Sequence, residues 1–223
     1  MIRDSHDLDE LKKEWLRNKD QYKEKFCRML FKTGLIRFII TKTKTEDIAP
    51  YFVKLDLLVS FPKEFQQTLA ILLKIVKLEV GLEKLTRIAA TTTHVLPYAA
   101  VLTHTLEVPM LFIETRKTGG RKRRIDGILY PGDKVLIVDD VVSTGETAKS
   151  AADKLRSEGA LVEDFAALLD NERGGRERLK SEGINLHAFI TISEVADYLE
   201  KMSLITTDEH RIIYGWVKRK HAS

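Results

Sequence analysis

The sequence predicts an α/β protein: a parallel central sheet flanked by helices, with a small N-terminal hood sheet and helix attached to it. Two observations support this fold class. After residue 81, short apolar runs alternate with helix-length segments or loops, an order typical of parallel strands covered by helices on both faces. Before residue 81, a long amphipathic helical pattern precedes two β-branched and aromatic runs, which favour a separate small sheet.

The composition is that of a globular protein without disulfides or membrane spans. Of 223 residues, 43% are hydrophobic and 31% are charged, and the net charge is +4, so a packed core is feasible and general disorder is excluded. The one cysteine, Cys27, cannot form an intrachain disulfide or a cysteine-based zinc cluster, and it favours a reducing compartment. No apolar run approaches the roughly 20 residues of a membrane-spanning helix, and the first 30 residues are too charged for a signal peptide. We therefore expect a cytoplasmic protein without a membrane partner.

The N-terminal third is expected to form a helix, a small sheet and a second helix. Residues 7–32 place apolar side chains at helical spacing. Residues 35–40 and 51–58 are predicted strands joined by a polar stretch. Residues 62–80 are predicted to form a helix that Gly81 ends. The apolar positions of the first helix are Leu8, Leu11, Trp15, Tyr22, Phe26 and Met29.

Neither an internal repeat nor a Pro/Gly/Ser-rich linker divides the chain. We therefore expect two parts, a helical extension at residues 1–34 and a single domain at residues 35–223. The strands of its sheet are predicted at residues 87–90, 109–113, 134–138, 162–169 and 184–190. Two closing helices are predicted at residues 193–202 and 207–218, the second capped by Thr207.

Residues 135–147, VLIVDDVVSTGET, carry the strongest functional signal in the chain. Four consecutive apolar residues predict a strand buried on both faces. Asp139 and Asp140 follow at its carboxyl end, which is the edge at which open α/β sheets bind ligands. Residues 143–147 form a small hydroxyl-rich turn leading into a helix predicted over residues 147–157.

The chemistry of this segment suits a phosphorylated sugar. Backbone N–H groups, hydroxyls and the positive end of a helix converge on one point, which favours a phosphate. Two adjacent carboxylates can accept hydrogen bonds from a sugar diol, so we interpret the segment as a cradle for a ribose 5-phosphate. The alternative is purely structural, with the acids capping the helix and Ser-Thr-Gly forming a plain turn. A Walker-type loop is excluded because no Gly-Lys-Ser/Thr follows the strand.

The same thirteen residues resemble the phosphoribosyl-pyrophosphate (PRPP) signature of type I phosphoribosyltransferases. Over roughly residues 30–195 the chain is most similar to the orotate phosphoribosyltransferases of that family, in the order and spacing of its motifs. The points of likeness are Ala49-Pro50-Tyr51-Phe52, Ser60-Phe61-Pro62, Leu96-Pro97, Pro109-Met110-Leu111, Tyr130-Pro131-Gly132-Asp133, Leu169-Asp170, Gly174-Gly175 and Leu186-His187.

This resemblance implies an activity, a cofactor and partners. The activity is transfer of 5-phosphoribosyl from PRPP to orotate, which gives orotidine 5'-monophosphate and pyrophosphate in pyrimidine nucleotide biosynthesis. The cofactor is Mg²⁺, held through PRPP and not directly by the protein. The partners are the small-molecule substrates and a second copy of the chain, since related enzymes are homodimers in which a mobile loop completes the neighbouring site. We expect the apolar face of the helix at residues 7–32 to contribute to that dimer.

The resemblance also assigns site residues. Asp139 and Asp140 are implied to hold the ribose hydroxyls, and Lys44 to lie near PRPP. Phe52 and Val53 are implied to border orotate. The residues implied to wrap the 5-phosphate are Val141, Val142, Ser143, Thr144, Gly145, Glu146 and Thr147, with Ser143 also touching the base.

Two loops depart from the family pattern. Residues 90–95 lack the usual glycine, so Thr93 and His94 are expected to donate to pyrophosphate from their side chains, although a lone histidine there is also typical of a cap or surface residue. Residues 116–124 form a basic run with two glycines. A charged run of this kind is ordinarily a solvated loop, but a basic mobile loop beside a PRPP cradle is also typical of this chemistry. In one alignment Arg116 and Lys117 keep the family positions and Lys122 reaches pyrophosphate; in another, Glu114 and Thr115 occupy those positions.

Asn171 stands where the family has an arginine that pairs with the orotate carboxylate. Arginine binds a carboxylate bidentately and asparagine cannot. Either Arg173 takes over from two residues away, or the base is not orotate. The alternatives are therefore a phosphoribosyltransferase for another nucleobase, or a PRPP- or nucleotide-sensing regulator that lost catalysis and touches nucleic acid through residues 116–124. A charge of +4 and the absence of an evident helix-turn-helix argue against nucleic acid as a partner.

Overall fold

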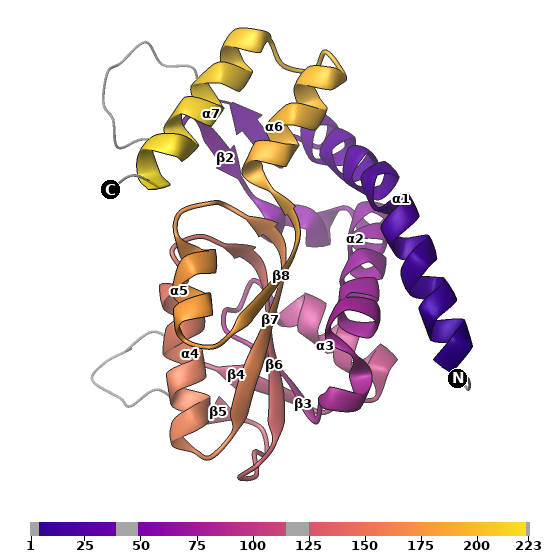
Figure 1. The fold of residues 1–223 in the computed structure, drawn as a ribbon, viewed down its shortest axis with the longest axis vertical. Coiled ribbons are helices and arrows are strands. Elements are labelled where there is room, and N and C mark those ends of the chain that lie inside the picture. Colours follow the sequence, from indigo (N-terminus) through magenta and orange to yellow (C-terminus); the bar gives the residue numbers. More distant parts are fainter. Residues whose placement is uncertain (1–4, 39–48, 115–124, 222–223) are drawn as a thin grey trace.

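The computed structural model describes residues 5–38, 49–114 and 125–221. Its centre is a six-stranded sheet in the order β5-β4-β3-β6-β7-β8 (Figure 1). All its strands run parallel except β5, which pairs antiparallel with β4 at one edge. The mainly parallel central sheet that the sequence predicts is thus confirmed. The strands are β3 (Arg87–Ala90), β4 (Met110–Ile113), β5 (Ile125–Asp126), β6 (Lys134–Val142), β7 (Leu161–Asp170) and β8 (Asn185–Thr191).

Helices cover both faces of this sheet (Figure 1). One face carries α2 (Pro62–Lys74) and α3 (Leu96–Leu106), and the other carries α4 (Glu146–Ser157) and α5 (Gly175–Ser181). Each face has its own buried hydrophobic cluster, and β6 contributes alternate residues to the two. The strand is therefore buried on both faces because its side chains alternate between two helical layers.

The order of the strands reverses between β3 and β6. From β3 the chain continues to β4 on one side, whereas from β6 it continues to β7 and β8 on the other. Ala90 of β3 lies opposite Val138 of β6, so the loops that follow the two strands begin side by side. Open α/β sheets bind ligands in the crevice at such a switch point.

The predicted hood sheet is present as β1 (Ile36–Phe38) and β2 (Tyr51–Val53), which pair antiparallel. The prediction that the second strand runs to residue 58 is wrong, because Leu55–Ser60 form a 3-10 helix. Leu55 and Leu58 are both buried, and a spacing of three places them on one face of a 3-10 helix, whereas a strand would turn them to opposite faces.

The N-terminal helix α1 (Ser5–Lys32) packs against the body beside α2 (Figure 1). Its side chains Trp15, Phe26, Cys27 and Leu30 are buried in the main hydrophobic cluster. The Trp15 indole N–H donates to Glu79 Oε1 at 2.7 Å. The division of the chain at residue 34 stays a prediction, but the apolar face expected to contribute to a dimer is largely covered by the chain's own core.

Two local details of the predicted helices differ from the structure. Residues Ile75–Val80, expected as the end of an α-helix, form a π-helix that carries Glu79 to α1. The helix α7 (Thr207–His221) is capped by Thr206, whose Oγ1 accepts the Glu209 N–H at 3.2 Å, and not by Thr207. The helix α6 (Ile192–Lys201) begins with a capping box between Thr191 and Glu194.

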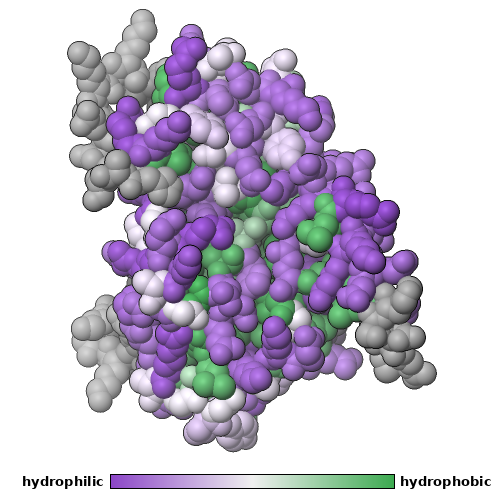
Figure 2. All heavy atoms as spheres, viewed as in Figure 1, coloured by the Kyte–Doolittle hydropathy of each residue, from purple (hydrophilic) through white to green (hydrophobic). Residues whose placement is uncertain are grey.

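The surface seen in Figure 2 is mainly hydrophilic, and apolar side chains reach it in small areas. Within the described residues, no helix combines the length and the apolar character needed to cross a membrane.

Candidate active site

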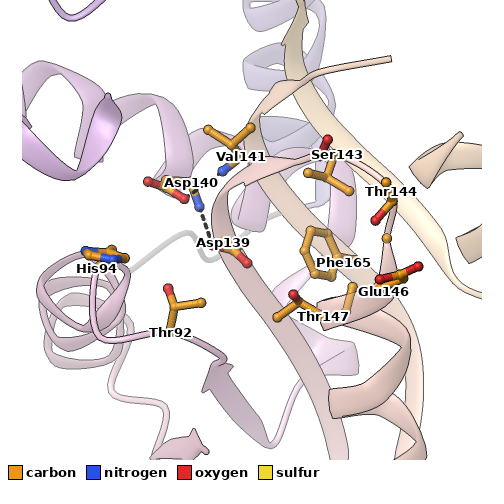
Figure 3. Close-up of a pocket in the computed structure, with 13 residues that line it drawn as sticks. Thr92, His94, Asp139, Asp140, Val141, Ser143, Thr144, Glu146, Thr147 and Phe165 are labelled. Atoms are coloured by element: carbon orange, nitrogen blue, oxygen red, sulfur yellow. Dashed lines mark hydrogen bonds between the residues drawn. The ribbon is translucent and has the colours of Figure 1, made fainter. Parts of the chain in front are cut away.

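A cavity of about 200 Å³ lies at the carboxyl ends of β3 and β6 (Figure 3). Three segments build it: the loop after β3, the end of β6 with the first turn of α4, and β7. Its position follows from the strand order, since the two loops leave adjacent strands toward opposite faces of the sheet. The lining residues are Thr92, His94, Asp139, Asp140, Val141, Val142, Ser143, Thr144, Gly145, Glu146, Thr147, Ala148 and Phe165.

The acidic pair is held rigidly by hydrogen bonds. Asp139 is only 7% exposed; its Oδ1 accepts the N–H of Asp140 at 2.9 Å, drawn as a dashed line in Figure 3. Its Oδ2 accepts the hydroxyl of Thr91 at 3.0 Å, and Asp140 Oδ1 accepts the N–H of Val141 at 2.8 Å. The strand register explains the contact with Thr91, since the residues before these two, Ala90 and Val138, are paired.

Burial changes the protonation of this pair. Burial, followed by the nearby charge of Asp140, raises the pKa of Asp139 well above its usual range. Burial also raises the pKa of Asp140. A ligand that donates hydrogen bonds, such as a diol, would therefore stabilise the ionised form of both carboxylates.

The turn after the acids ends in a helix N-terminus that lacks a side-chain cap. Gly145 is the N-cap of α4, with a φ of +73°, a conformation that glycine adopts without strain. The first N–H groups of a helix have no partner within it, and here no side chain of the cap satisfies them. The hydroxyls of Ser143, Thr144 and Thr147 lie beside them, so hydrogen-bond donors suited to an anion gather next to two carboxylates.

A second glycine, Gly175 at the start of α5, packs directly against this turn. A Cβ added at Gly175 would lie 2.3 Å from the carbonyl oxygen of Ser143 and 3.2 Å from the nitrogen of Gly145. Only a residue without a side chain allows the two loops to approach so closely. Sequence reasoning noted Gly174-Gly175 as a point of likeness and missed this supporting role, which only the fold reveals.

The structure brings together most of the residues predicted to bind the phosphate and the ribose, and further residues contribute to the same cavity. Thr93 is exposed and does not line the cavity, whereas its neighbour Thr92 does. Sequence reasoning also missed Phe165 and Thr91. Phe165 lies on β7 opposite Ile137, so strand register, which the sequence alone does not give, places it at the cavity.

The residues predicted to border the base lie on the hood side and do not line this cavity. Phe52, on β2, is 50% exposed, and Val53 follows it. The hydroxyl of Tyr51 donates to Asn171 Oδ1 at 2.9 Å, which joins the hood to the end of β7. The guanidinium of Arg173 lies 5.4 Å from the ring centre of Trp216.

Four predicted site residues fall outside the described ranges. They are Lys44, Arg116, Lys117 and Lys122. Glu114, from the alternative alignment, lies just after β4, and Thr115 falls outside the described residues.

Together these features define an open α/β protein with a ligand crevice at the switch point of its sheet. The family model described as the phosphoribosyl transferase domain matches residues 83–199, from just before β3 into α6. Orotate phosphoribosyltransferase of Cenarchaeum symbiosum is 32% identical over 191 residues, which cover 85% of this chain and 96% of that protein. Uridine 5'-monophosphate synthase of Bos taurus is 34% identical over 162 residues, 72% of this chain and 33% of that protein, so the match spans about a third of its length.

The crystal structure of orotate phosphoribosyltransferase from Aeropyrum pernix has the same fold, with a TM-score of 0.70 at 24% identity; the match covers 81% of this chain and 99% of that one. The chain belongs to the type I phosphoribosyltransferase family and resembles its orotate phosphoribosyltransferases.

Proposed function

We propose that this protein transfers the 5-phosphoribosyl group of PRPP to orotate, releasing pyrophosphate and forming orotidine 5'-monophosphate for pyrimidine nucleotide biosynthesis. The names of its relatives support this reaction. The observation that carries the proposal is the junction of β6 and α4, where the buried carboxylate of Asp139 and the half-buried carboxylate of Asp140 adjoin an uncapped helix N-terminus.

In this proposal each part of the junction binds one part of the phosphorylated sugar. Asp139 and Asp140 accept hydrogen bonds from the two ring hydroxyls of the ribose. Residues 141–147 surround the 5-phosphate with backbone N–H groups and hydroxyls. The side chain of Glu146 points outward, since it is exposed and approaches Arg178 at 3.4 Å. The sugar is thus fixed at both ends while its anomeric carbon stays free to react.

The bond that breaks sets the remaining requirements. Positive charge develops on the sugar ring and negative charge on the departing pyrophosphate, so fixed charges and donors accelerate the step. The carboxylates of Asp139 and Asp140 lie on the sugar side. Thr92 and His94 lie in the β3 loop across the cavity, where we place pyrophosphate. Thr93, Lys44, Arg116, Lys117 and Lys122 are proposed as further donors to PRPP.

We propose that Mg²⁺ is brought by the phosphates of PRPP. Among the described residues, no group of three or more His, Cys, Asp or Glu could hold a metal ion. Asp139 and Asp140 are two hard oxygen donors, compatible with Mg²⁺ but too few to complete its six-coordinate shell alone. The ion would supply positive charge that offsets the pyrophosphate.

A second candidate base follows from Asn171. Its side-chain oxygen already accepts the Tyr51 hydroxyl, and an amide carries no charge to pair with a carboxylate. A phosphoribosyltransferase acting on a base without a carboxylate is therefore the alternative. We also propose that the protein is a cytoplasmic homodimer. Light scattering at twice the chain mass is expected, and a monomer at assay concentration contradicts the dimer.

An assay of the purified protein tests the reaction. With Mg²⁺ and PRPP, we expect the ultraviolet absorbance of orotate to fall as pyrophosphate appears in equal amount. Asp139→Asn should lower this rate, because the ribose hydroxyls lose an ionised acceptor. A panel of uracil, adenine, guanine and hypoxanthine identifies the alternative: turnover of one of these without turnover of orotate would overturn the assignment.

A further inference from the structure

Asn171, which occupies the place of the family's carboxylate-binding arginine, carries no charge, and its side-chain oxygen and backbone N–H have other partners. Its Oδ1 accepts the hydroxyl of Tyr51 at 2.9 Å, and its backbone N–H donates to the carbonyl of Val142 at 2.8 Å. Both contacts fix the end of β7 to its neighbours. An anionic base would therefore need a cation from elsewhere in this part of the molecule.

Arg173, two residues along the chain, carries a positive charge in this part of the molecule. Its side chain is exposed, and within the described residues no carboxylate lies at ion-pair distance from it. Its guanidinium lies 5.4 Å from the centre of the Trp216 ring, within the roughly 6 Å over which a cation is attracted to an aromatic face. When the flat face of a guanidinium lies against an aromatic ring, the N–H groups along the edge of the guanidinium can still donate to a carboxylate.

Trp216 is itself held by packing. It is 3% exposed, its Nε1 has no hydrogen-bond partner among the described residues, and its ring meets Tyr51 edge-on at 5.5 Å between centroids and 83° between planes. Tyr51 in turn bonds Asn171, whereas its neighbour Phe52, the predicted wall of the base site, is exposed on the other face of β2. One continuous set of contacts thus joins β2, α7 and the loop after β7.

Resting on the proposed function, we infer that Arg173 binds the carboxylate of the pyrimidine base and that Trp216 of α7 positions it there. The helix α7 lies outside residues 83–199 that match the family model, so an element beyond the matched domain becomes part of the base-specificity site. Arg173 is a substrate-binding residue in this assignment, and Trp216 is a positioning residue.

Steady-state kinetics of four variants test this inference. We expect Arg173→Gln to raise the KM for orotate about 30-fold, since a charge-assisted hydrogen bond contributes about 1.5–3 kcal/mol, while the KM for PRPP stays within about twofold. Arg173→Lys should restore part of the loss. Trp216→Leu should raise the orotate KM about fivefold to tenfold through loss of the cation–π contact, and Trp216→Phe, which keeps an aromatic face, should raise it less.

Two matched controls separate this role from a general loss of structure. Arg211→Gln removes an exposed arginine from the same helix, and Trp15→Phe alters a buried tryptophan in α1. Both should leave the orotate KM unchanged. Melting temperatures of all variants are recorded alongside the kinetics.

The outcomes distinguish the inference from the function on which it rests. A wild-type protein that turns over no orotate overturns both. A wild-type protein that turns over orotate while Arg173→Gln retains its KM overturns the inference alone. If Trp216→Leu raises the KM for PRPP as much as that for orotate, Trp216 has only a structural role and its positioning role is overturned.

Discussion

At the scale of single residues, the acidic pair shows how burial and function oppose each other. Asp139 is nearly buried, and its carboxyl accepts hydrogen bonds from the hydroxyl of Thr91 and the backbone N–H of Asp140. Its raised pKa means that the folded protein without ligand holds the charged form at a cost. A ligand with two adjacent hydroxyls reduces that cost, because each hydroxyl donates to an ionised oxygen. The site is therefore more favourable with ligand than without.

This raised pKa predicts opposite pH dependences for stability and binding. Above the ordinary value of 3.8, and up to the raised pKa, the folded protein holds more protons than the unfolded chain, so its stability falls as pH rises through that window. Hydrogen bonds from sugar hydroxyls favour the charged form of Asp139. The affinity for a ribose ligand therefore rises with pH through the same window, and binding releases protons. Melting curves against pH, and calorimetry in two buffers of different ionisation enthalpy, measure both. Asp139→Asn with an unchanged pH slope of stability would contradict this linkage.

Gly175 gives a prediction about the phosphate turn. A methyl group there would meet the Ser143 carbonyl at 2.3 Å, so Gly175→Ala must displace one of the two loops. Overpacking of this kind typically costs about 1–3 kcal/mol of stability, and we expect affinity for a ribose phosphate to fall about tenfold or more. Urea denaturation and calorimetry report the two effects separately. Affinity within twofold of wild type would show that the approach of the loops is unimportant.

Residues differ in how far the sequence predicts them. Residues 135–147 were interpretable because one strand and one turn contain all their chemistry. The sequence does not reveal Phe165, Thr91 or the supporting role of Gly175, because each reaches the site through strand register or loop packing. Trp216 could not be predicted either, since its contacts with Tyr51 and Arg173 join segments distant in sequence.

At the scale of elements, the spacing of apolar residues and the length of apolar runs explain which secondary-structure predictions are right and which are wrong. Five strands of the central sheet are predictable because each contains a short apolar run, whereas the sequence gives no such signal for the two-residue edge strand β5. The strand predicted over residues 51–58 is wrong at residues 55–58, because two buried leucines three residues apart also suit an apolar strand in composition. The π-helix at residues 75–80 lies beyond periodicity analysis, since its extra residue per turn keeps nearly the same apolar pattern.

A glycine in the helix α7 gives a second prediction about stability. It is also a control for Gly175→Ala, because the same substitution is made where there is room for a methyl group. Gly215 lies within α7, and a Cβ there would meet nothing within 4 Å. Gly215→Ala should stabilise the protein by about 0.5–1 kcal/mol, because alanine loses less backbone entropy in a helix. Thermal and urea denaturation measure this gain. A loss of stability would mean that this face of α7 is covered in solution.

At the scale of the whole molecule, α1 belongs to the same core as the sheet. Trp15, Phe26, Cys27 and Leu30 fill space against the body, and Trp15 also bonds Glu79. The predicted boundary at residue 34 therefore marks a change in sequence character, and we propose that it does not separate two independently folding units.

A truncated chain tests this proposal. Residues 35–223 alone should fail to unfold cooperatively, because removing α1 exposes the apolar surface that its four buried side chains cover. Circular dichroism during a urea titration distinguishes a sharp transition from a gradual one. A cooperative transition with the wild-type midpoint would establish that the domain of residues 35–223 folds by itself.

The fold places an uncapped helix N-terminus and an acidic pair at a single switch point, and the proposed binding of a phosphorylated ribose depends on this arrangement. Calorimetric titration of ribose 5-phosphate and of orotidine 5'-monophosphate into the wild-type protein and into the double variant Asp139→Asn, Asp140→Asn is the most direct measurement. We expect one site per chain in the wild type, and at least about tenfold weaker binding in the variant through loss of two charged acceptors. Absence of binding to the wild type, or equal affinity for the variant, would contradict the central claim.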